Sequence, residues 1–331
     1  MLAVEADPAP ARKKGLHYGF MIIAAGFLTQ FVLLCCQRMP ALTLENIRVA
    51  LNISYTEVGL ITSWFTVFYA GGAFLWGYLN DAIGAKKTLS LAAAVAAIGL
   101  VAFGAFAQNG LLVAVIVWSV AGLGCAGLYM ATLPVLIANW FAPKRRGFAM
   151  GLITPGGNVC SIVLGLVVPT LVVSSSWQVG FIVVGVFCAL VTVFIFAFVR
   201  TYPSEKGLAP YGSPAGTQAA PSPNVETLQE EKDARQKPEK DAGHKAGQKA
   251  VQKTARLSNF AHVLRSGITW HFGALYTIYQ IGYMVSTTYY VASTIYAGYT
   301  PVEAGLGITF GGLATVVSLN VFGNLSDRIE R

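Results

Sequence analysis

One arginine closes a long stretch of sequence that contains no other charged residue. No Asp, Glu, Lys or Arg lies between Lys14 and Arg38, so Arg38 falls in the outer third of a predicted membrane span. A charge in that position is costly and usually functional, and a guanidinium can hold a carboxylate through two parallel hydrogen bonds. Arg38 is therefore a candidate for binding an anionic substrate. The alternative is that its side chain extends to the outer membrane surface.

Polar side chains also recur along one apolar segment near the C-terminus. Tyr276, Gln280, Tyr283 and Thr287 follow spacings of four, three and four residues, which place them on one face of a helix. Such a face suits the wall of a substrate cavity, and hydrogen bonding between helices is the alternative. We expect three polar residues of other segments to face the same cavity: Gln30, Tyr129 and Asn158.

These groups favour binding over catalysis. An enzyme inside a membrane needs placed catalytic groups, such as paired carboxylates, a nucleophile with a base, or a metal site. The predicted spans contain no embedded acid, and the spacing of the five cysteines fits no zinc site. We therefore predict that the protein is not an enzyme and has no catalytic residues, no metal site and no cofactor. The cysteines are interpreted as small apolar packing residues.

The membrane-spanning helices that position these residues are predicted from the stretches of sequence that contain no charged residue. Hydrophobic residues make up 55% of the chain and charged residues 11%, whereas soluble proteins carry about 25% charge. A spanning helix needs about 20 apolar residues. Four charge-free gaps hold one span each, and two longer gaps, broken at residues 108–110 and 174–176, hold two each. The sequence therefore predicts eight spans, in the gaps between residues 14–38, 57–81, 87–144, 146–200, 265–303 and 303–327.

Basic residues alternate between the loops that join these spans. Lys and Arg gather before the first span and after the second, fourth, sixth and eighth, whereas the other loops hold almost none. Because Lys and Arg favour cytoplasmic loops, we predict a multi-pass protein of a bacterial-type cytoplasmic (inner) membrane with both termini in the cytoplasm. The net charge of +8 then reflects topology and contact with anionic headgroups of the lipid bilayer. A nucleic-acid partner is not expected, because no soluble basic face with interleaved aromatic residues exists.

Composition divides the chain into three parts. Residues 229–254 are rich in Lys, Glu, Gln, Ala and Gly and contain no aromatic residue, so they cannot bury enough apolar surface to become ordered. Residues 201–258 are predicted to form a flexible cytoplasmic linker, with residues 212–255 mobile. The linker would join a six-helix bundle of residues 1–200 to two helices in residues 259–331.

A short pattern occurs twice, once after the second span and once after the eighth. The first copy, residues 77–87, reads GYLNDAIGAKK, and the second, residues 323–329, reads GNLSDRI. Each copy is a turn that leaves a helix on the same predicted side of the membrane. Two copies six helices apart are the signature of two parallel six-helix repeats.

With these motifs the chain resembles the Major Facilitator Superfamily. Residues 139–151, which read NWFAPKRRGFAMG, agree with that resemblance, and so does the long basic connector after six spans. The resemblance implies an all-α membrane protein with an MFS-type helical bundle, which acts as a monomer. This sequence would supply eight of the family's twelve helices, so we expect a chain truncated after the eighth helix.

The same resemblance implies a gate. In the family, the acid of the repeated motif locks the outward-facing state by meeting the positive end of a helix in the opposite half. Asp327 is therefore expected near Gly147, at the start of the fifth span, and a solvated turn charge is the alternative. Ala82 stands where the family usually has Arg. The gating candidates are Gly77, Asp81, Gly84, Lys86, Gly323, Asp327 and Arg328.

For function, the resemblance implies a secondary active transporter of a small solute that works by alternating access, as a symporter or antiporter. The first span and the loop after it look like bacterial monocarboxylate or oxalate–formate-type carriers. Together with Arg38 they indicate that the substrate is an organic anion such as a monocarboxylate. The coupling partner is either a proton or a counter-anion. The alternatives are a carrier of neutral or cationic solutes, such as sugars or drugs, and a non-transporting fragment.

Overall fold

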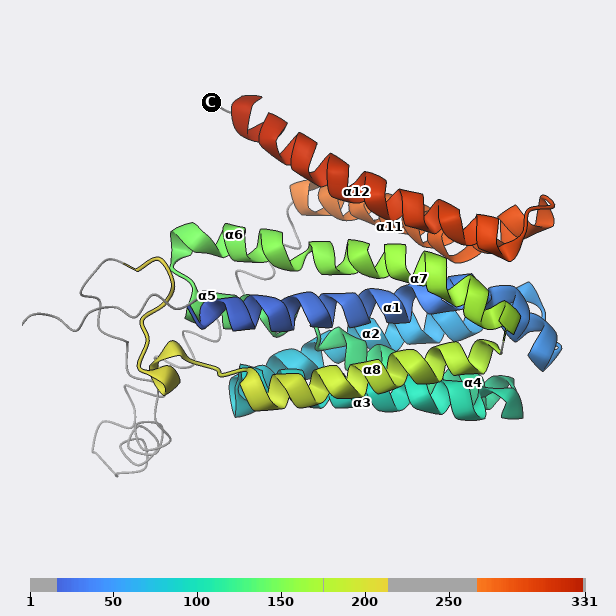
Figure 1. Ribbon diagram of the computed structural model, residues 1–331, viewed down its shortest axis with the longest axis horizontal. Coiled ribbons are helices and arrows are strands. Elements are labelled where there is room, and N and C mark those ends of the chain that lie inside the picture. The colour runs from blue at the N-terminus through green and yellow to red at the C-terminus, as the bar shows by residue number, and fades with distance from the viewer. Residues whose placement is uncertain (1–16, 175, 214–266, 330–331) are drawn as a thin grey trace, which may run out of the picture.

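The computed structural model describes residues 17–174, 176–213 and 267–329 (Figure 1), and this part of the chain is built of helices, without a β-strand. Two short 3-10 helices cover Ala107–Asn109 and Pro203–Lys206. The α-helices are α1 (Gly19–Leu51), α2 (Tyr55–Ile83), α3 (Ala85–Phe106), α4 (Leu111–Ala126), α5 (Leu133–Trp140), α6 (Pro143–Ile153), α7 (Pro155–Ser174), α8 (Trp177–Phe198), α11 (Gly267–Tyr296) and α12 (Pro301–Ile329).

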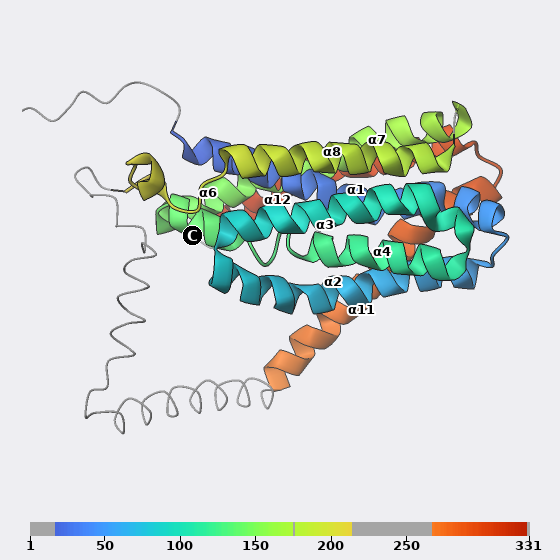
Figure 2. The same ribbon diagram turned by 90° about the horizontal axis from the view of Figure 1, so that it is seen from below.

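Most of these helices lie roughly parallel in one elongated bundle (Figures 1 and 2). Within the described residues, five helical segments are long and apolar enough to cross a membrane: Gly19–Leu51, Tyr55–Ile83, Ala85–Asn109, Pro143–Val172 and Trp177–Phe198. Helix α4 is apolar but shorter. The helices cover the charge-free gaps, although α1 continues past Arg38 to Leu51, and the total of eight spans stays a prediction.

The predicted fourth span is not one continuous helix. Helix α4 ends at Ala126 and α5 begins at Leu133, and residues 127–132 between them form turns. Pro134 explains the break, because proline has no N–H to donate and its ring clashes with the preceding turn. The side chain of Asn80 on α2 stabilises the irregular backbone by donating from Nδ2 to the carbonyl oxygen of Ala131 at 3.3 Å.

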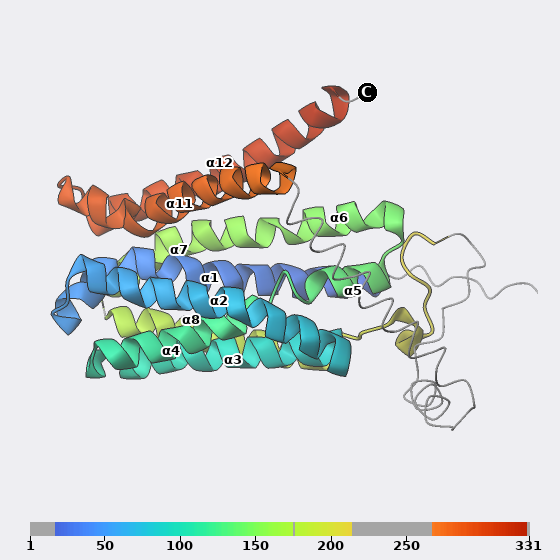
Figure 3. The same cartoon turned by 180° about the vertical axis from the view of Figure 1, so that it is seen from behind.

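The predicted fifth span is also divided, at the place where the sequence indicates a weak helix. Helix α6 ends at Ile153 and α7 begins at Pro155. Thr154 between them has helical backbone angles, and its hydroxyl donates to the carbonyl of Met150 at 2.9 Å. The two helices therefore run nearly in line, as Figures 1 and 3 show.

Small residues let the bundle helices approach closely. The tightest contact joins α3 to α4, where Gly99 faces Ala121 and Gly124 faces Ala96. A Cβ atom on either glycine would lie only 2.6 Å from the Cα atom of the alanine opposite. These two helices therefore pack backbone against backbone.

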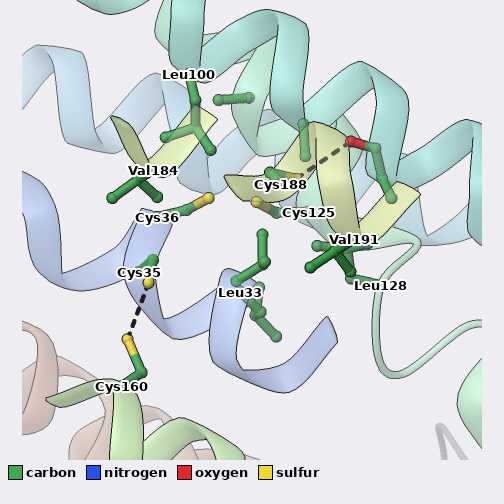
Figure 4. Packing of buried hydrophobic residues seen from close by; sticks show 14 of the residues in the cluster. Leu33, Cys35, Cys36, Leu100, Cys125, Leu128, Cys160, Val184, Cys188 and Val191 are labelled. Atoms are coloured by element: carbon green, nitrogen blue, oxygen red, sulfur yellow. Dashed lines mark hydrogen bonds between the residues drawn. The ribbon is translucent and has the colours of Figure 1, made fainter. Parts of the chain in front are cut away.

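All five cysteines lie buried in the core, as the interpretation as packing residues requires. Figure 4 shows Cys36, Cys125 and Cys188 gathered where α1, α4 and α8 meet, and the Cys188 thiol donates to the carbonyl of Ala93 at 3.3 Å. On the other side of α1, the Sγ atoms of Cys35 and Cys160 lie 3.2 Å apart. Cysteines thus fill both faces of α1 where larger side chains would separate the helices.

The start of α12 repeats the start of α2. Each helix opens with a capping box in which a hydroxyl residue and a glutamate three positions later exchange hydrogen bonds. In α2 the Ser54 N–H donates to Glu57 at 2.7 Å, and in α12 the Thr300 N–H donates to Glu303 at 2.8 Å. The same number of residues separates Ser54 from Asp81 in the first copy and Thr300 from Asp327 in the second. The internal repeat therefore extends over the full length of this helix, beyond the motif itself.

The first residues of the predicted linker lie against the bundle. Residues 200–213, which we call the strap, run beside the loop that joins α5 to α6. Tyr211 donates from its N–H to the carbonyl of Trp140 at 2.8 Å and accepts from the N–H of Ala142 at 3.0 Å. The Trp140 indole donates to the carbonyl of Arg200 at 2.8 Å. Residues 214–258 of the predicted linker lie outside the described residues.

We expect the strap to detach when its main aromatic contact is removed. The Tyr211 ring lies 5.3 Å from the His17 ring and 5.8 Å from the Phe141 ring, so Tyr211→Ala removes both contacts. Trypsin should then cleave at Lys206 several-fold faster than in the unaltered protein. Tyr296→Ala, at a residue that is 93% exposed, serves as the control. Equal cleavage rates in both variants would show that the ring contacts do not hold the strap.

Candidate functional site

A polar cavity of about 260 Å³ lies between α1 and α7 on one side and α11 and α12 on the other. Figures 1 and 3 show α11 and α12 lying along α7 and α1 at the end of the bundle remote from the strap. Three glycines of α12, Gly307, Gly311 and Gly312, form part of its wall. Its polar lining consists of Arg38, Asn158, Ser161, Ser286, Tyr290 and Thr315.

Arg38 is the charged residue of this lining. Its Nη2 donates to the Tyr283 hydroxyl at 3.0 Å, and the guanidinium carbon lies 5.4 Å from the centre of the Tyr283 ring, a cation–π contact. Its Nε atom is buried without a hydrogen-bond partner. A buried donor without a partner is unfavourable, so a shift of the guanidinium that let this atom meet an acceptor would be favourable.

Arg38 is held in place by the tight packing of α1 on α7. Gly156 and Gly157 of α7 lie directly against Phe27 and Leu34 of α1. The thiols of Cys35 and Cys160 touch, three residues before Arg38 on α1 and two residues after Asn158 on α7. Because α1 and α7 pack this closely, both polar side chains are presented on the same wall.

The predicted substrate-binding residues divide into three groups. Arg38, Asn158 and Tyr283 come together at the cavity, the last through its bond to Arg38. Gln30 lies beside Gly157 of α7 with its Oε1 buried and unpartnered, but it is not part of this lining. Tyr129 lies in the irregular segment between α4 and α5 and packs on the apolar core. The side chains of Tyr276 and Gln280 lie outside the described residues.

Four lining residues were missed by sequence reasoning: Ser161, Ser286, Tyr290 and Thr315. A signal existed for two of them, because Ser286 and Tyr290 follow Tyr283 by three and seven residues and so share its face. Single serines and threonines in apolar helices carry little information alone, since they also bond to their own backbone.

The gating candidates lie far along the bundle from this cavity, at the end that carries the strap. Asp81 is exposed near the end of α2, and Gly84 ends that helix with a φ of 83°, a conformation that favours glycine. No heavy atom of the described residues lies near a Cβ placed on Gly77. Lys86 packs over the Phe196 ring at 5.1 Å.

The second copy of the motif cannot be compared at the level of side chains, because those of Gly323, Asp327 and Arg328 lie outside the described residues. Toward its C-terminal end, α12 diverges from α6 (Figures 1 and 3). The gating role of both copies, and the approach of Asp327 to Gly147, stay predictions.

Helix α12 is fastened to α7 by a seam of small residues. Gly165 and Gly305 face each other so closely that a Cβ on Gly165 would lie 2.6 Å from the Gly305 carbonyl oxygen. The Thr309 hydroxyl donates across the seam to the carbonyl of Ile162 at 3.3 Å. The seam brings the glycines of α12 up to Asn158 and Ser161 and thereby closes one side of the cavity.

A bundle of helices long and apolar enough to cross a membrane has the architecture of an integral membrane protein. A sequence profile described as the Major Facilitator Superfamily matches residues 26–331. The chain belongs to this superfamily. Its predicted membership and its predicted all-α membrane fold are confirmed. The division into residues 1–200, 201–258 and 259–331 stays a prediction.

Curated relatives of the chain are carriers of small molecules. A hexuronate transporter of Bacillus subtilis is 34% identical over 157 residues, which are 47% of this chain and 36% of that protein. A probable sulfoacetate transporter of Cupriavidus necator is 26% identical over 52% of this chain and 40% of that protein. A glucose-6-phosphate exchanger of Homo sapiens is 29% identical over 51% of this chain and 34% of that protein. The matches therefore span well under half the length of these relatives.

Solved structures with the same fold include a peptide transporter in complex with sulfate. It matches 94% of this chain and 68% of that chain with a TM-score of 0.57 and 16% identity. A bacterial homolog of the human lysosomal transporter Spinster, in an inward-facing and unoccupied conformation, matches 66% of this chain and 50% of that chain with a TM-score of 0.51 and 18% identity. At these identities the similarity concerns the fold alone.

Proposed function

We propose that the protein transports a small organic anion, such as a monocarboxylate, by alternating access, and that Arg38 receives the acid group. The observation that carries this proposal is the position of Arg38 in the cavity lining, with an Nε atom that has no hydrogen-bond partner. A carboxylate could accept from Nε and from one terminal nitrogen together, the bidentate arrangement that arginine favours. The guanidinium would then lose part of its contact with Tyr283 and contact the substrate instead.

The charge of the cavity supports an anion over a cation. None of the described lining residues is an aspartate or a glutamate. A cationic solute would therefore meet a guanidinium of like charge with no carboxylate of the described lining to offset it, which is unfavourable. The named substrates of the three relatives, a hexuronate, a sulfoacetate and a sugar phosphate, are themselves anions at neutral pH.

The position of the cavity supports alternating access. It lies between the helices that precede the strap and the helix pair α11 and α12, where two halves of a transporter would move against each other. We further propose that the strap end of the bundle faces the cytoplasm of a bacterial-type inner membrane, because the basic loops gather there. The protein would act as a monomer coupled to a proton or to a counter-anion.

Ligand-dependent stabilisation and counterflow together test this proposal. A ligand that binds the folded state raises the unfolding midpoint, so purified protein should be heated with acetate, lactate, gluconate, neutral glucose or cationic choline. We expect at least one anion to raise the midpoint and to support counterflow of its labelled form in proteoliposomes. Stabilisation by glucose or choline alone would favour the neutral or cationic alternative. Anion binding without counterflow would contradict transport by this chain.

A further inference from the structure

We infer that the substrate is a monoanion that bears several hydroxyl groups, with its carboxylate on Arg38 and its hydroxyls along Asn158, Ser161, Ser286, Tyr290 and Thr315. This inference rests on the proposed function and narrows the class of anion. The cavity volume of about 260 Å³ lies below the roughly 300–1,000 Å³ typical of sites for drug-sized ligands. It therefore suits a compact solute.

The charge of the lining limits the charge of the ligand. Arg38 is the one charged side chain among the described residues of the cavity. A carboxylate of charge −1 is balanced by this guanidinium. A phosphate monoester close to charge −2 would be only half balanced by this guanidinium. The lining thus favours a monoanion over a dianion.

The hydroxyl groups of the lining require a ligand that donates hydrogen bonds. Ser161 donates its hydrogen to the carbonyl of Gly157 at 3.3 Å, and Thr315 donates to the carbonyl of Gly311 at 2.8 Å. A hydroxyl has a single hydrogen to donate, so while these bonds to the helix backbone hold, the two oxygens offer lone pairs to a ligand. A carboxylate or an alkyl chain cannot donate to them, whereas a hydroxyl group of the ligand can.

Helix α11 supplies the opposite side of this polar lining. Ser286 and Tyr290 lie one turn apart on it and both line the cavity. The Tyr290 hydroxyl lies directly over Gly307, where a Cβ atom would overlap it. Glycine at position 307 therefore makes room for this hydroxyl in the wall. Hydroxyl groups thus face the cavity from α7, α11 and α12, and one apolar ligand could not satisfy them.

Four probe compounds separate charge from hydroxyl content. Gluconate carries both one negative charge and hydroxyls, hexanoate carries the charge without hydroxyls, glucose carries hydroxyls without charge, and glucose 6-phosphate carries hydroxyls with nearly two charges. Affinities of the 331-residue chain in detergent can be measured by calorimetry. We expect gluconate to bind at least tenfold more tightly than each of the other three.

Variants of the lining test the same inference from the protein side. Losing one hydrogen bond costs about 0.5–1.5 kcal/mol, which corresponds to a two- to thirteenfold loss of affinity. We expect Tyr290→Phe and Ser286→Ala to weaken gluconate binding within this range and to leave hexanoate binding unchanged. Tyr296→Phe and Ser293→Ala lie on the same helix outside the cavity lining and should change neither.

The outcomes distinguish this inference from the proposed function. If hexanoate binds as tightly as gluconate, the hydroxyl lining does not select the ligand and the inference is wrong, while anion binding stands. If glucose 6-phosphate binds more tightly than gluconate, the inference that the site favours a monoanion is wrong. If neither gluconate nor hexanoate binds, or if glucose binds as well as gluconate, the proposed function and the inference fail together.

Discussion

Replacing Arg38 by glutamine is expected to weaken the binding of an anion such as gluconate by roughly thirtyfold or more. Truncating one partner of a buried, hydrogen-bonded charge pair costs about 2–5 kcal/mol, and each 1.4 kcal/mol is a factor of ten in affinity. Glutamine keeps a polar side chain of moderate length but removes the charge and the forked donors. Calorimetric titration of the variant and of the unaltered protein measures the difference.

Two further substitutions define what the arginine contributes. Arg38→Lys keeps the charge but loses the planar fork that matches a carboxylate, so its affinity should fall between those of the unaltered protein and Arg38→Gln. Arg48→Gln is the matched control, because Arg48 lies on the same helix but pairs with Glu45 at 2.6 Å. Unchanged anion binding in Arg38→Gln would contradict the binding role and favour a side chain that merely extends to the membrane surface.

Replacing Gly124 by alanine is expected to lower the free energy of unfolding by about 1–3 kcal/mol, the usual cost of overpacking a core. The added methyl group would meet the backbone nitrogen of Ala96, and it would lie 2.6 Å from the Ala96 Cα atom. Backbone atoms cannot rotate away as a flexible side chain can, so α3 and α4 must separate. A fall of several degrees in the unfolding midpoint in detergent measures the effect.

Helix α2, which packs against α4, offers a control with the same glycine-to-alanine substitution. Among the described residues, no heavy atom lies within 4 Å of a Cβ placed on Gly71 of α2, so Gly71→Ala adds the same methyl group without a clash in this part of the chain. Gly71→Ala should leave the unfolding midpoint unchanged or slightly raised, because alanine favours the helix. Equal midpoints for the two variants would mean that α3 and α4 can separate without loss of stability.

Hydropathy and local backbone chemistry made much of this fold predictable. Whether a segment is apolar over about 20 residues depends on that segment alone, and the helices occupy the charge-free gaps. The division of the fifth predicted span at Pro155 was also foreseeable, because proline acts on its own preceding turn. The break in the fourth was missed although Pro134 was visible in the sequence, and the Asn80 bond to Ala131 that supports the irregular backbone joins residues far apart in the chain.

The sequence by itself determined that this is an all-α membrane protein of the Major Facilitator Superfamily, and it singled out Arg38 and Asn158 as candidates. Only the tertiary structure decided which groups share one cavity. It excluded Gln30 and Tyr129 from the lining, added four hydroxyl residues, and placed the strap against the α5–α6 loop. The physical reason is that membrane partition is a property of each segment, whereas a cavity is formed by helices far apart in the chain. Which residues line the cavity depends on how closely small residues such as Gly165 and Gly305 let those helices approach.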